Sequence, residues 1–176
     1  IASTLGVIIL SSISAFALSR PFLLGRQFLF IMIAALMMVP GIASLIPLFV
    51  MVHDFGWLNT YLVLIIPYIA GGTVLGTFLM KAFIEQMTKE LFEAAQLDGA
   101  SNLQLYLRLV LPLSGPIIGS ITIITLINIW NDYFWPLLTI TDDQLRTVSI
   151  GLAFLQGQYT TNWGPLFAGY VLASLP

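Results

Sequence analysis

The sequence predicts an all-α, polytopic bundle of transmembrane helices with about five spans. Two observations support this fold class. Apolar residues make up 59% of the 176 residues and charged residues only 8%, whereas a soluble domain averages about 25% charged residues. The six Lys or Arg and eight Asp or Glu residues are also unevenly spaced. They leave five long stretches without any charge, at 1–19, 27–53, 55–80, 109–131 and 147–176.

These stretches are long enough to cross a bilayer, because a membrane-crossing helix needs about 20 apolar residues. We place spans at 1–19, 28–52, 61–80 and 113–139, and the beginning of a truncated span at 166–176. Both ends of the sequence fall in apolar stretches, so we expect it to be part of a longer chain. Residues 1–176 then form a single transmembrane domain, with a polar loop at 81–112.

The basic residues predict the orientation of these spans. With alternating spans, the loops 20–27 and 81–112 lie on the same side of the membrane, and they hold five of the six Lys and Arg residues. The positive-inside rule makes that side cytoplasmic. Tryptophan prefers the membrane–water interface, and all four tryptophans then fall at the outer ends of spans: Trp57, Trp130, Trp135 and Trp163.

Glycine and proline occur inside the predicted spans. Proline removes a backbone donor, and the carbonyls that it leaves free need neighbouring helices or cavity water. Interrupted spans would suit a bundle that opens and closes, although Gly and Pro are also common in ordinary membrane helices. The interruptions are Pro40-Gly41, Pro47, Pro67, Gly71-Gly72 and Gly115-Pro116.

The loop 81–112 holds seven of the fourteen charges and is predicted to form a helix-turn-helix. The hydroxyl of Thr88 is expected to cap a first helix over 89–97, and Gly99 suits the left-handed residue that ends it. Ser101 with Gln104 has the spacing of a capping box that starts a second helix. Its apolar stripe is expected at Leu103, Tyr106, Leu107 and Val110. The pair could pack against the ends of the spans, or form a docking surface for a soluble partner.

The residues of this loop resemble the EAA loop of bacterial ABC importer permeases. The match runs from Glu93-Ala94-Ala95 through Gly99 to Leu109-x-Leu111-Pro112. The family usually has Ile where this chain has Leu109. Residues 128–138 resemble the signature of sugar-importer permeases similar to the smaller maltose-transporter permease, and Leu58-Asn59-Thr60-Tyr61 and Gly151-Leu152 with Gln156-Gly157 fit the same subfamily. The resemblance covers essentially all 176 residues, from the second to the sixth helix of a six-helix subunit.

The resemblance implies a type I importer permease fold in a bacterial or archaeal cytoplasmic (inner) membrane. In this family the EAA loop forms a coupling helix in a cleft of a cytoplasmic ATP-binding subunit. Closure of two such subunits switches the pore from inward- to outward-facing. The implied coupling residues are Glu93, Ala94, Ala95, Asp98, Gly99, Leu109 and Pro112.

Partners are implied as well. ATP and Mg are expected on the partner ATPase and no cofactor on this chain, which lacks the Gly-Lys step of a phosphate-binding loop. The other implied partners are a second, different permease subunit and an extracytoplasmic solute-binding protein. Nucleic acid is not expected, because the net charge is −2 and no basic cluster is present.

Three polar residues are candidates for the substrate path. Asp132 lies roughly 29 Å along the helix from Leu113, which places it near the outer interface as either an anchor or a pore residue. Asn128 and Asn131 could bond to a sugar hydroxyl or to a neighbouring helix. The outer stretch 141–163 could contact the binding protein, or be only a loop.

Other functional classes have less support. An intramembrane enzyme needs paired acids or a metal motif, but the sequence offers only Asp132 and a lone His53, which is expected to be solvated. An ion-coupled carrier needs ionisable residues near the membrane midplane. No Asp, Glu, Lys or Arg is expected at the midplane of the predicted spans. The prediction is therefore a permease for a sugar or oligosaccharide. The alternatives are a permease for another small polar solute (a polyol, glycerol phosphate or amino acid) and, with less support, an ion-coupled carrier.

Overall fold

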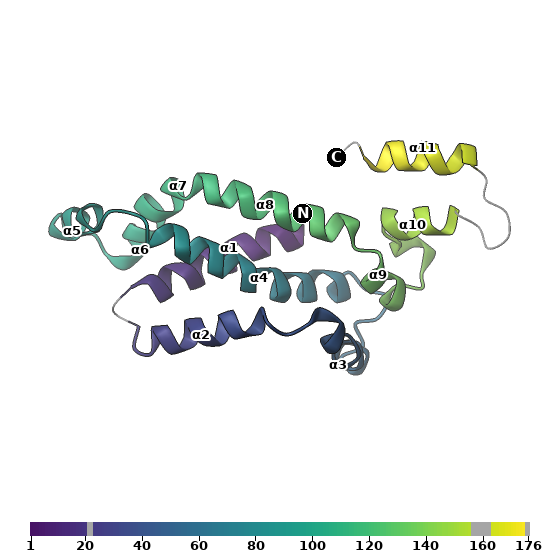
Figure 1. Ribbon diagram of the computed structural model, residues 1–176, viewed down its shortest axis with the longest axis horizontal. Coiled ribbons are helices and arrows are strands. Elements are labelled where there is room, and N and C mark those ends of the chain that lie inside the picture. Colours follow the sequence, from purple (N-terminus) through teal and green to yellow (C-terminus); the bar gives the residue numbers. More distant parts are fainter. Residues whose placement is uncertain (21–22, 156–162, 175–176) are drawn as a thin grey trace. The chain divides into compact units, whose positions relative to one another are not determined.

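The computed structural model describes residues 1–20, 23–155 and 163–174, and every regular element in these ranges is helical (Figure 1). The fold class predicted from the sequence is therefore confirmed. The α-helices are α1 (Ala2–Ser19), α2 (Arg26–Leu36), α3 (Gly41–Asp54), α4 (Leu62–Ile84), α5 (Lys89–Leu97), α6 (Asn102–Gln104), α7 (Leu111–Leu113), α8 (Gly115–Asn131), α9 (Phe134–Thr139), α10 (Val148–Leu155) and α11 (Trp163–Ala173). A π-helix over Leu105–Val110 joins α6 to α7, and a 3₁₀ turn covers Asp143–Leu145.

Two of the described helices, α1 and α4, are each long and apolar enough to cross a membrane. The number rises to four if each of two bent helix pairs counts as one span. The first pair is α2 with α3, bent by 96°, and the second is Asn102–Leu113 with α8, bent by 71°. The shorter apolar helix α11 begins at Trp163, slightly before the start predicted for the last span.

The predicted span 28–52 consists of two helices, and the interruption predicted at Pro40-Gly41 is confirmed. Helix α2 ends at Leu36 and α3 begins at Gly41. Proline disfavours the helical conformation of the residue before it and has no N–H to continue the ladder, so Pro40 accounts for the break. Pro47 lies inside α3 without ending it.

The segment 113–139 is also divided, because α8 ends at Asn131 and α9 begins at Phe134. The predicted single span is thus a long helix followed by a short one. Helix α8 begins directly after Ser114, so Gly115-Pro116 marks a true bend at the start of this span.

Helix α4, by contrast, runs unbroken through Pro67 and Gly71-Gly72, which were predicted to interrupt it. Two glycines of α4, Gly72 and Gly76, lie in close contact with α1, whereas a Cβ atom on Gly71 would have nothing within 4 Å. A Cβ atom on Gly72 would lie 2.6 Å from Val7 Cγ2, and one on Gly76 would lie 2.8 Å from Ser11 Cβ. Small residues let two membrane helices approach closely, so these positions hold α1 against α4.

The chain forms two compact units, Ile1–Ser44 with Ile66–Leu126 (unit 1) and Leu45–Ile65 with Ile127–Pro176 (unit 2). Five of the six Lys and Arg residues belong to unit 1, and all four Trp residues belong to unit 2. Unit 1 therefore holds most of the basic residues that predict the cytoplasmic side, and unit 2 holds the tryptophans that predict the outer side.

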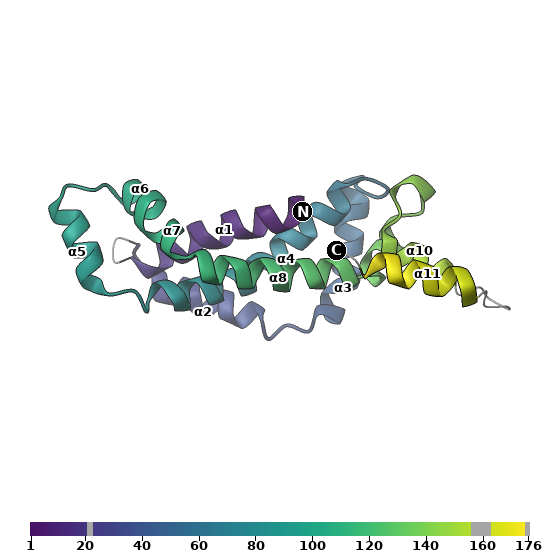
Figure 2. The same cartoon turned by 90° about the horizontal axis from the view of Figure 1, so that it is seen from above.

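Unit 1 has a core that joins the membrane helices to the loop 81–112. Figure 2 shows α5 and α6 at one end of this unit, with α7 leading into α8. Phe92 of α5 and Leu105 of the π-helix are buried in the same cluster as residues of α1, α4 and α8. The loop is therefore anchored to the helices. The buried members are Val7, Ala15, Phe16, Met80, Ile84, Phe92, Leu105, Val110 and Ile121.

Candidate functional site

The first helix of the loop forms over the predicted residues. Helix α5 spans Lys89–Leu97, with Thr88 at the N-cap position and Asp98 at the C-cap position. The Thr88 side chain, however, makes no capping hydrogen bond, so that detail of the prediction is wrong. Thr88 is exposed, and water can satisfy the free amides at an exposed helix end.

The turn after α5 has the predicted backbone conformation and the predicted helix cap. Gly99 has a φ of +80°, and the N–H of Ala100 donates to the carbonyl of Ala95 at 3.0 Å. Ser101 and Gln104 form the predicted capping box: the Gln104 N–H donates to Ser101 Oγ at 3.3 Å, and the Ser101 N–H donates to Gln104 Oε1 at 2.8 Å. Both features are confirmed, and they orient the second helix of the loop.

The apolar face of the second helix differs from the prediction. Leu105 and Val110 are buried, whereas Leu103 and Leu107 have exposed fractions of 65% and 50%. The π-helix over 105–110 has more residues per turn than an α-helix and rotates the side chains within and after it, which accounts for the exposure of Leu107. Leu103 precedes the π-helix, in α6. The predicted stripe is thus wrong at Leu103 and Leu107.

As a result, the loop presents apolar side chains on its surface. This segment is predicted to lie outside the bilayer, so lipid is not expected to cover these side chains. The acids Glu93 and Asp98 are exposed on the same loop. The large exposed apolar residues of the loop are Leu91, Leu97, Leu103 and Leu107.

The structure brings some of the predicted coupling residues together. Ala95, Asp98, Gly99 and Leu109 line one cavity of about 410 Å³ between the turn and the π-helix. Ala95 and Leu109 also pack on the core of unit 1. The remaining three, Glu93, Ala94 and Pro112, are exposed and lie outside this cavity.

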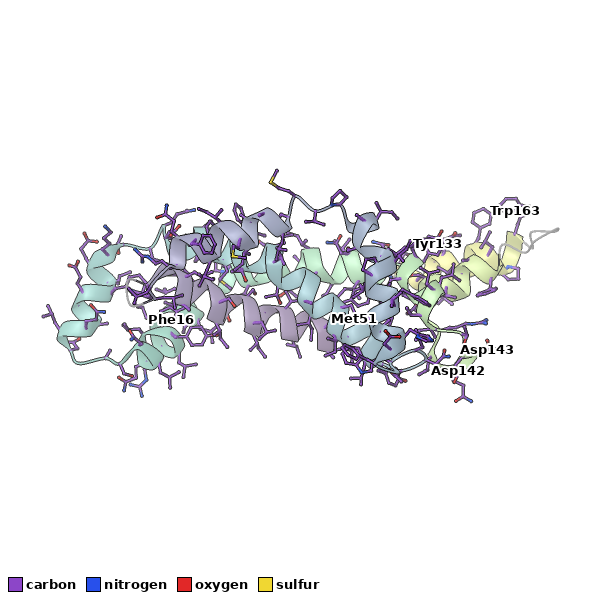
Figure 3. All side chains as sticks on the ribbon, turned by 90° about the horizontal axis from the view of Figure 1, so that it is seen from below. Phe16, Met51, Tyr133, Asp142, Asp143 and Trp163 are labelled. Atoms are coloured by element: carbon purple, nitrogen blue, oxygen red, sulfur yellow. The ribbon has the colours of Figure 1, made fainter. Side chains whose placement is uncertain are left out.

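Arg20 connects α1 to α5 in a way that the sequence analysis missed. Its guanidinium carbon lies 3.5 Å from the centroid of the Phe92 ring and 5.3 Å from that of Phe16. Phe16, labelled in Figure 3, also contacts the Tyr106 ring at 5.5 Å. The Tyr106 hydroxyl hydrogen-bonds to Ser12 Oγ at 2.7 Å. These contacts attach both helices of the loop to α1.

Burial lowers the pKa of the Arg20 guanidinium from its ordinary value because the charged form loses water. Stacking on aromatic rings partly compensates a buried cation. Phe16 lies one turn before Arg20 on α1, but Phe92 is more than 70 residues away in the chain, so no local pattern signals the stacking on Phe92.

The substrate-path candidates lie at the junction of α8 and α9 in unit 2. Asp132 Oδ1 accepts hydrogen bonds from the N–H groups of Phe134 at 3.0 Å and Trp135 at 3.3 Å. Asn131 Nδ2 donates to the carbonyl of Ile127, one turn earlier on its own helix. Asn128 is exposed on α8. Asp132 therefore satisfies free N–H groups at the start of α9. This structural role is compatible with the predicted position of Asp132 at the membrane interface.

Two tryptophans of this region, Trp130 and Trp135, form hydrogen bonds to backbone carbonyls of unit 2. Trp135 is 6% exposed, and its indole N–H donates to the Val63 carbonyl at 2.9 Å. The indole N–H of Trp130 donates to the Ala173 carbonyl at 3.0 Å. Trp130 also lines a cavity of about 690 Å³ with Asn131 and Tyr133. Figure 3 labels Tyr133 and Trp163, both of them more than 40% exposed.

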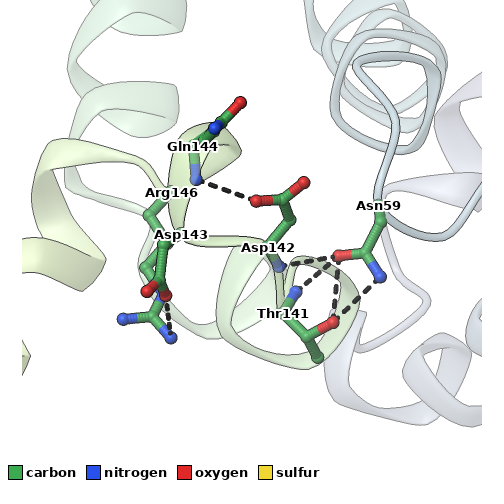
Figure 4. A network of polar contacts seen from close by, with 6 residues as sticks. All are labelled: Asn59, Thr141, Asp142, Asp143, Gln144 and Arg146. Atoms are coloured by element: carbon green, nitrogen blue, oxygen red, sulfur yellow. Dashed lines mark hydrogen bonds and ion pairs between the residues drawn. The ribbon is translucent and has the colours of Figure 1, made fainter.

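Asn59 organises a second polar network in unit 2 (Figure 4). Its Oδ1 accepts hydrogen bonds from the N–H of Thr141 at 2.6 Å and of Asp142 at 3.0 Å. Its own N–H donates to the Thr139 carbonyl at 3.1 Å. Asn59 thus ties the turn before α4 to the turn after α9. From the sequence, Asn59 was expected only to belong to the subfamily motif Leu58-Asn59-Thr60-Tyr61, and this network was not predicted.

The rest of the outer stretch is ordered by short-range contacts. Asp142 Oδ1 accepts the Gln144 N–H at 3.0 Å, and Asp143 pairs with Arg146 at 2.7 Å. Residues 156–162 of the predicted contact stretch lie outside the described residues. His53 is exposed beside Asp54 at 3.2 Å, and the described part of the chain holds no cluster of three or more potential metal ligands.

Comparison with known proteins gives the family. The family described as "Binding-protein-dependent transport system inner membrane component" matches residues 7–176. The chain belongs to this family. Its members are inner-membrane transport components, so the chain is part of a multi-pass membrane protein.

Several curated members of the family are similar over nearly the whole chain. The trehalose/maltose permease MalG of Thermococcus litoralis is 35% identical over 98% of this chain and 63% of its own length. The melibiose/raffinose/stachyose permease MelC of Bacillus subtilis is 34% identical over 99% and 63%. The sn-glycerol-3-phosphate permease UgpE of Salmonella typhi is 36% identical over 98% and 62%. The chain thus spans less than two thirds of the length of these relatives.

A solved structure shows the same fold. It is the crystal structure of a bacterial ABC transporter involved in the import of the acidic polysaccharide alginate. The TM-score is 0.70 at 27% identity, over 96% of this chain and 60% of that chain. The bundle described here is therefore an ABC importer permease fold.

Proposed function

We propose that this chain is the membrane-spanning part of a permease subunit in an ATP-driven importer for a sugar or oligosaccharide. The loop 81–112 docks on a cytoplasmic ATPase, which binds and hydrolyses ATP with Mg. A second permease subunit completes the translocation path, and an external solute-binding protein delivers the substrate. Relatives whose names specify trehalose and maltose, or melibiose, raffinose and stachyose, support this assignment.

The observation that carries the proposal is the surface of the loop. Leu97 and Leu103, on either side of the Gly99 turn, have exposed fractions of 89% and 65%. A short, well-capped helix pair with exposed leucines and acids suits a partner groove that is apolar at its base and basic at its rim. Because Phe92 and Leu105 anchor the pair in the core of unit 1, a displacement of the loop would be transmitted to α1 and α4.

The proposed substrate path passes the junction of α8 and α9. Asn128, Asn131 and Asp132 occupy the end of α8 and the turn into α9. Asn131 Oδ1 remains available to accept a sugar hydroxyl while Nδ2 is bonded within α8. The charge-free stretches of the sequence favour a neutral, polyhydroxylated solute over an anionic one. We therefore propose these three residues as contacts along the path.

The test is co-purification of the full-length chain with its membrane and cytoplasmic partners. The reconstituted complex, with its binding protein, is then assayed for ATPase stimulation by maltose, trehalose, melibiose and raffinose. sn-Glycerol 3-phosphate serves as the anionic comparison. We expect an ATPase to co-purify and at least one neutral sugar to stimulate it.

A matched pair of variants tests the docking surface itself. Leu97→Ser lies on the exposed turn and should weaken ATPase association, whereas Phe154→Ser removes an equally apolar, 57% exposed side chain in unit 2 and should not. If no ATPase associates with the wild-type chain, the importer function fails. If both variants bind the ATPase as the wild type does, the loop is not the docking surface.

A further inference from the structure

A second cavity in unit 1 has a basic lining. It has a volume of about 430 Å³ and lies where α1 ends, α2 begins and α4 is followed by α5. Arg20, Arg26 and Lys89 line it, which are three of the six basic residues in the whole sequence. This concentration of positive charge is absent from the predicted ATPase-contact residues of the loop.

The guanidinium of Arg20 has unused hydrogen-bonding capacity. One face stacks on the Phe92 ring at 3.5 Å, but its buried Nε and Nη2 atoms have no hydrogen-bond partner among the described residues. A buried charged donor without a partner is costly. The Nε–Nη2 edge is also the fork that binds phosphate or carboxylate oxygens in pairs. Arg20 thus indicates an anionic ligand.

The acids of the cavity do not neutralise this charge. Glu85 lines the cavity, but its carboxylate pairs with Lys81 at 2.5 Å. Arg26 makes one weak hydrogen bond, from Nη1 to the Ser19 carbonyl at 3.3 Å. Three cations therefore face one remaining acid, Glu93.

The rest of the lining combines apolar side chains with the polar Ser19 and Gln96. Ile84, Met87 and the Phe92 ring line the cavity beside the three cations. The lining therefore suits a ligand that is anionic at one end and apolar at the other. By the predicted orientation, the cavity lies at the cytoplasmic edge of the bilayer, where anionic headgroups are available and basic pockets between membrane helices bind them.

We propose that this cavity binds the phosphate group of an anionic phospholipid of the cytoplasmic leaflet. Arg26 and Lys89 hold the phosphate at the rim, and binding draws the Nε–Nη2 edge of Arg20 toward it. The glycerol and the first part of the acyl chains lie against Ile84 and Met87. The inference requires only a membrane location, and it does not depend on sugar transport or on ATPase docking. Inorganic phosphate shares the headgroup chemistry and is the alternative source of the anion.

The experiment measures thermal unfolding of the full-length chain in neutral detergent. Phosphatidylglycerol, phosphatidylcholine or inorganic phosphate is titrated into separate samples, and bound lipid is counted by native mass spectrometry. We expect phosphatidylglycerol to raise Tm more than phosphatidylcholine does. The variant Arg26→Gln/Lys89→Gln should weaken the apparent affinity for phosphatidylglycerol by about tenfold or more, since it removes two charged hydrogen bonds.

The control carries the same charge change elsewhere. Arg108→Gln/Arg146→Gln should keep the phosphatidylglycerol response of the wild type. Arg20→Gln, measured separately because Arg20 also packs on Phe92, should weaken binding in the same direction. Equal responses to phosphatidylglycerol and phosphatidylcholine would overturn the proposal. So would an equal loss in the control variant, and protection by inorganic phosphate alone would show that the anion is not a lipid.

Discussion

At the scale of single residues, Gly99 connects a backbone angle to the proposed coupling. Its φ of +80° is rarely adopted by other residues, yet a Cβ there would meet nothing within 4 Å. Gly99→Ala should therefore cost about 1–2 kcal/mol of backbone strain without any clash. We expect it to shift the turn and weaken ATPase stimulation, while the amount of protein in the membrane fraction stays unchanged.

The matched control for this substitution is Gly56→Ala in unit 2. Gly56 has a φ of +68° and is equally free of contacts, so the strain is the same but the loop is untouched. Transport and substrate-stimulated ATPase activity of the reconstituted complex are the measurements. Wild-type values for both in Gly99→Ala would remove the turn from the mechanism.

Asn59 contributes to stability in two ways, through its backbone conformation and through its side-chain hydrogen bonds, and substitutions can distinguish them. It is the one described non-glycine residue with positive φ, at +54°, and its side chain bonds to Thr141 and Asp142. Asn59→Ala should lose about 2 kcal/mol of stability, about half from the backbone conformation and half from the hydrogen bonds.

Two further variants at this position distinguish the contribution of the backbone conformation from that of the hydrogen bonds. Asn59→Gly keeps the conformation and loses only the hydrogen bonds, so its Tm should lie between those of wild type and Asn59→Ala. Asn59→Asp keeps the acceptor oxygen and should remain near the wild type. Thermal unfolding of the purified full-length protein gives the order, and equal Tm values for the Ala and Gly variants would contradict the assigned strain.

At the scale of elements, the π-helix decides which leucines are structural. Leu105 is 1% exposed and Leu103 is 65% exposed, the reverse of what an α-helical stripe predicts. Leu105→Ala should therefore destabilise the fold by about 2–5 kcal/mol, and Leu103→Ala by no more than about 0.5 kcal/mol. Chemical or thermal unfolding distinguishes the two. A larger loss for Leu103→Ala would mean that the segment is an ordinary α-helix.

The breaks between helices are the other element-scale finding. Prolines lie within or between several of the described helices. Pro40 and Gly115-Pro116 coincide with a sharp bend, whereas α4 continues through Pro67. A proline removes one hydrogen bond and crowds the preceding turn. Whether the helix then breaks depends on packing. In α4, the helix is continuous at Pro67, and the turns that follow pack closely on α1 through Gly72 and Gly76.

At the scale of the whole molecule, the orientation can be tested directly. These 176 residues contain no cysteine, so single cysteines can be introduced without background from this region. Gln96→Cys and Gln144→Cys place the same substitution at exposed sites of units 1 and 2. In intact cells, a membrane-impermeant maleimide should label Gln144→Cys, and it should label Gln96→Cys only after permeabilisation. The opposite pattern would reverse the predicted topology.

Several features of the fold could be predicted from the sequence because they depend on residues close in the chain. The charge-free stretches predict the positions of the apolar helices, since bilayer partitioning adds up along a segment. The limits of α5, the positive φ of Gly99 and the capping box of Ser101 with Gln104 follow from contacts within a few residues. The family motif in the loop was likewise readable from the sequence alone.

Other features were decided only by the tertiary structure, because their partners are far apart in the chain. The stacking of Arg20 on Phe92 and the bonds from Asn59 to Thr141 leave no local pattern. The buried face of the second loop helix depends on how the π-helix packs into the core of unit 1. Local composition therefore determined where the helices are and which loop is polar. Long-range packing decided which leucines of the loop are buried and which are exposed, and where three basic residues line one cavity.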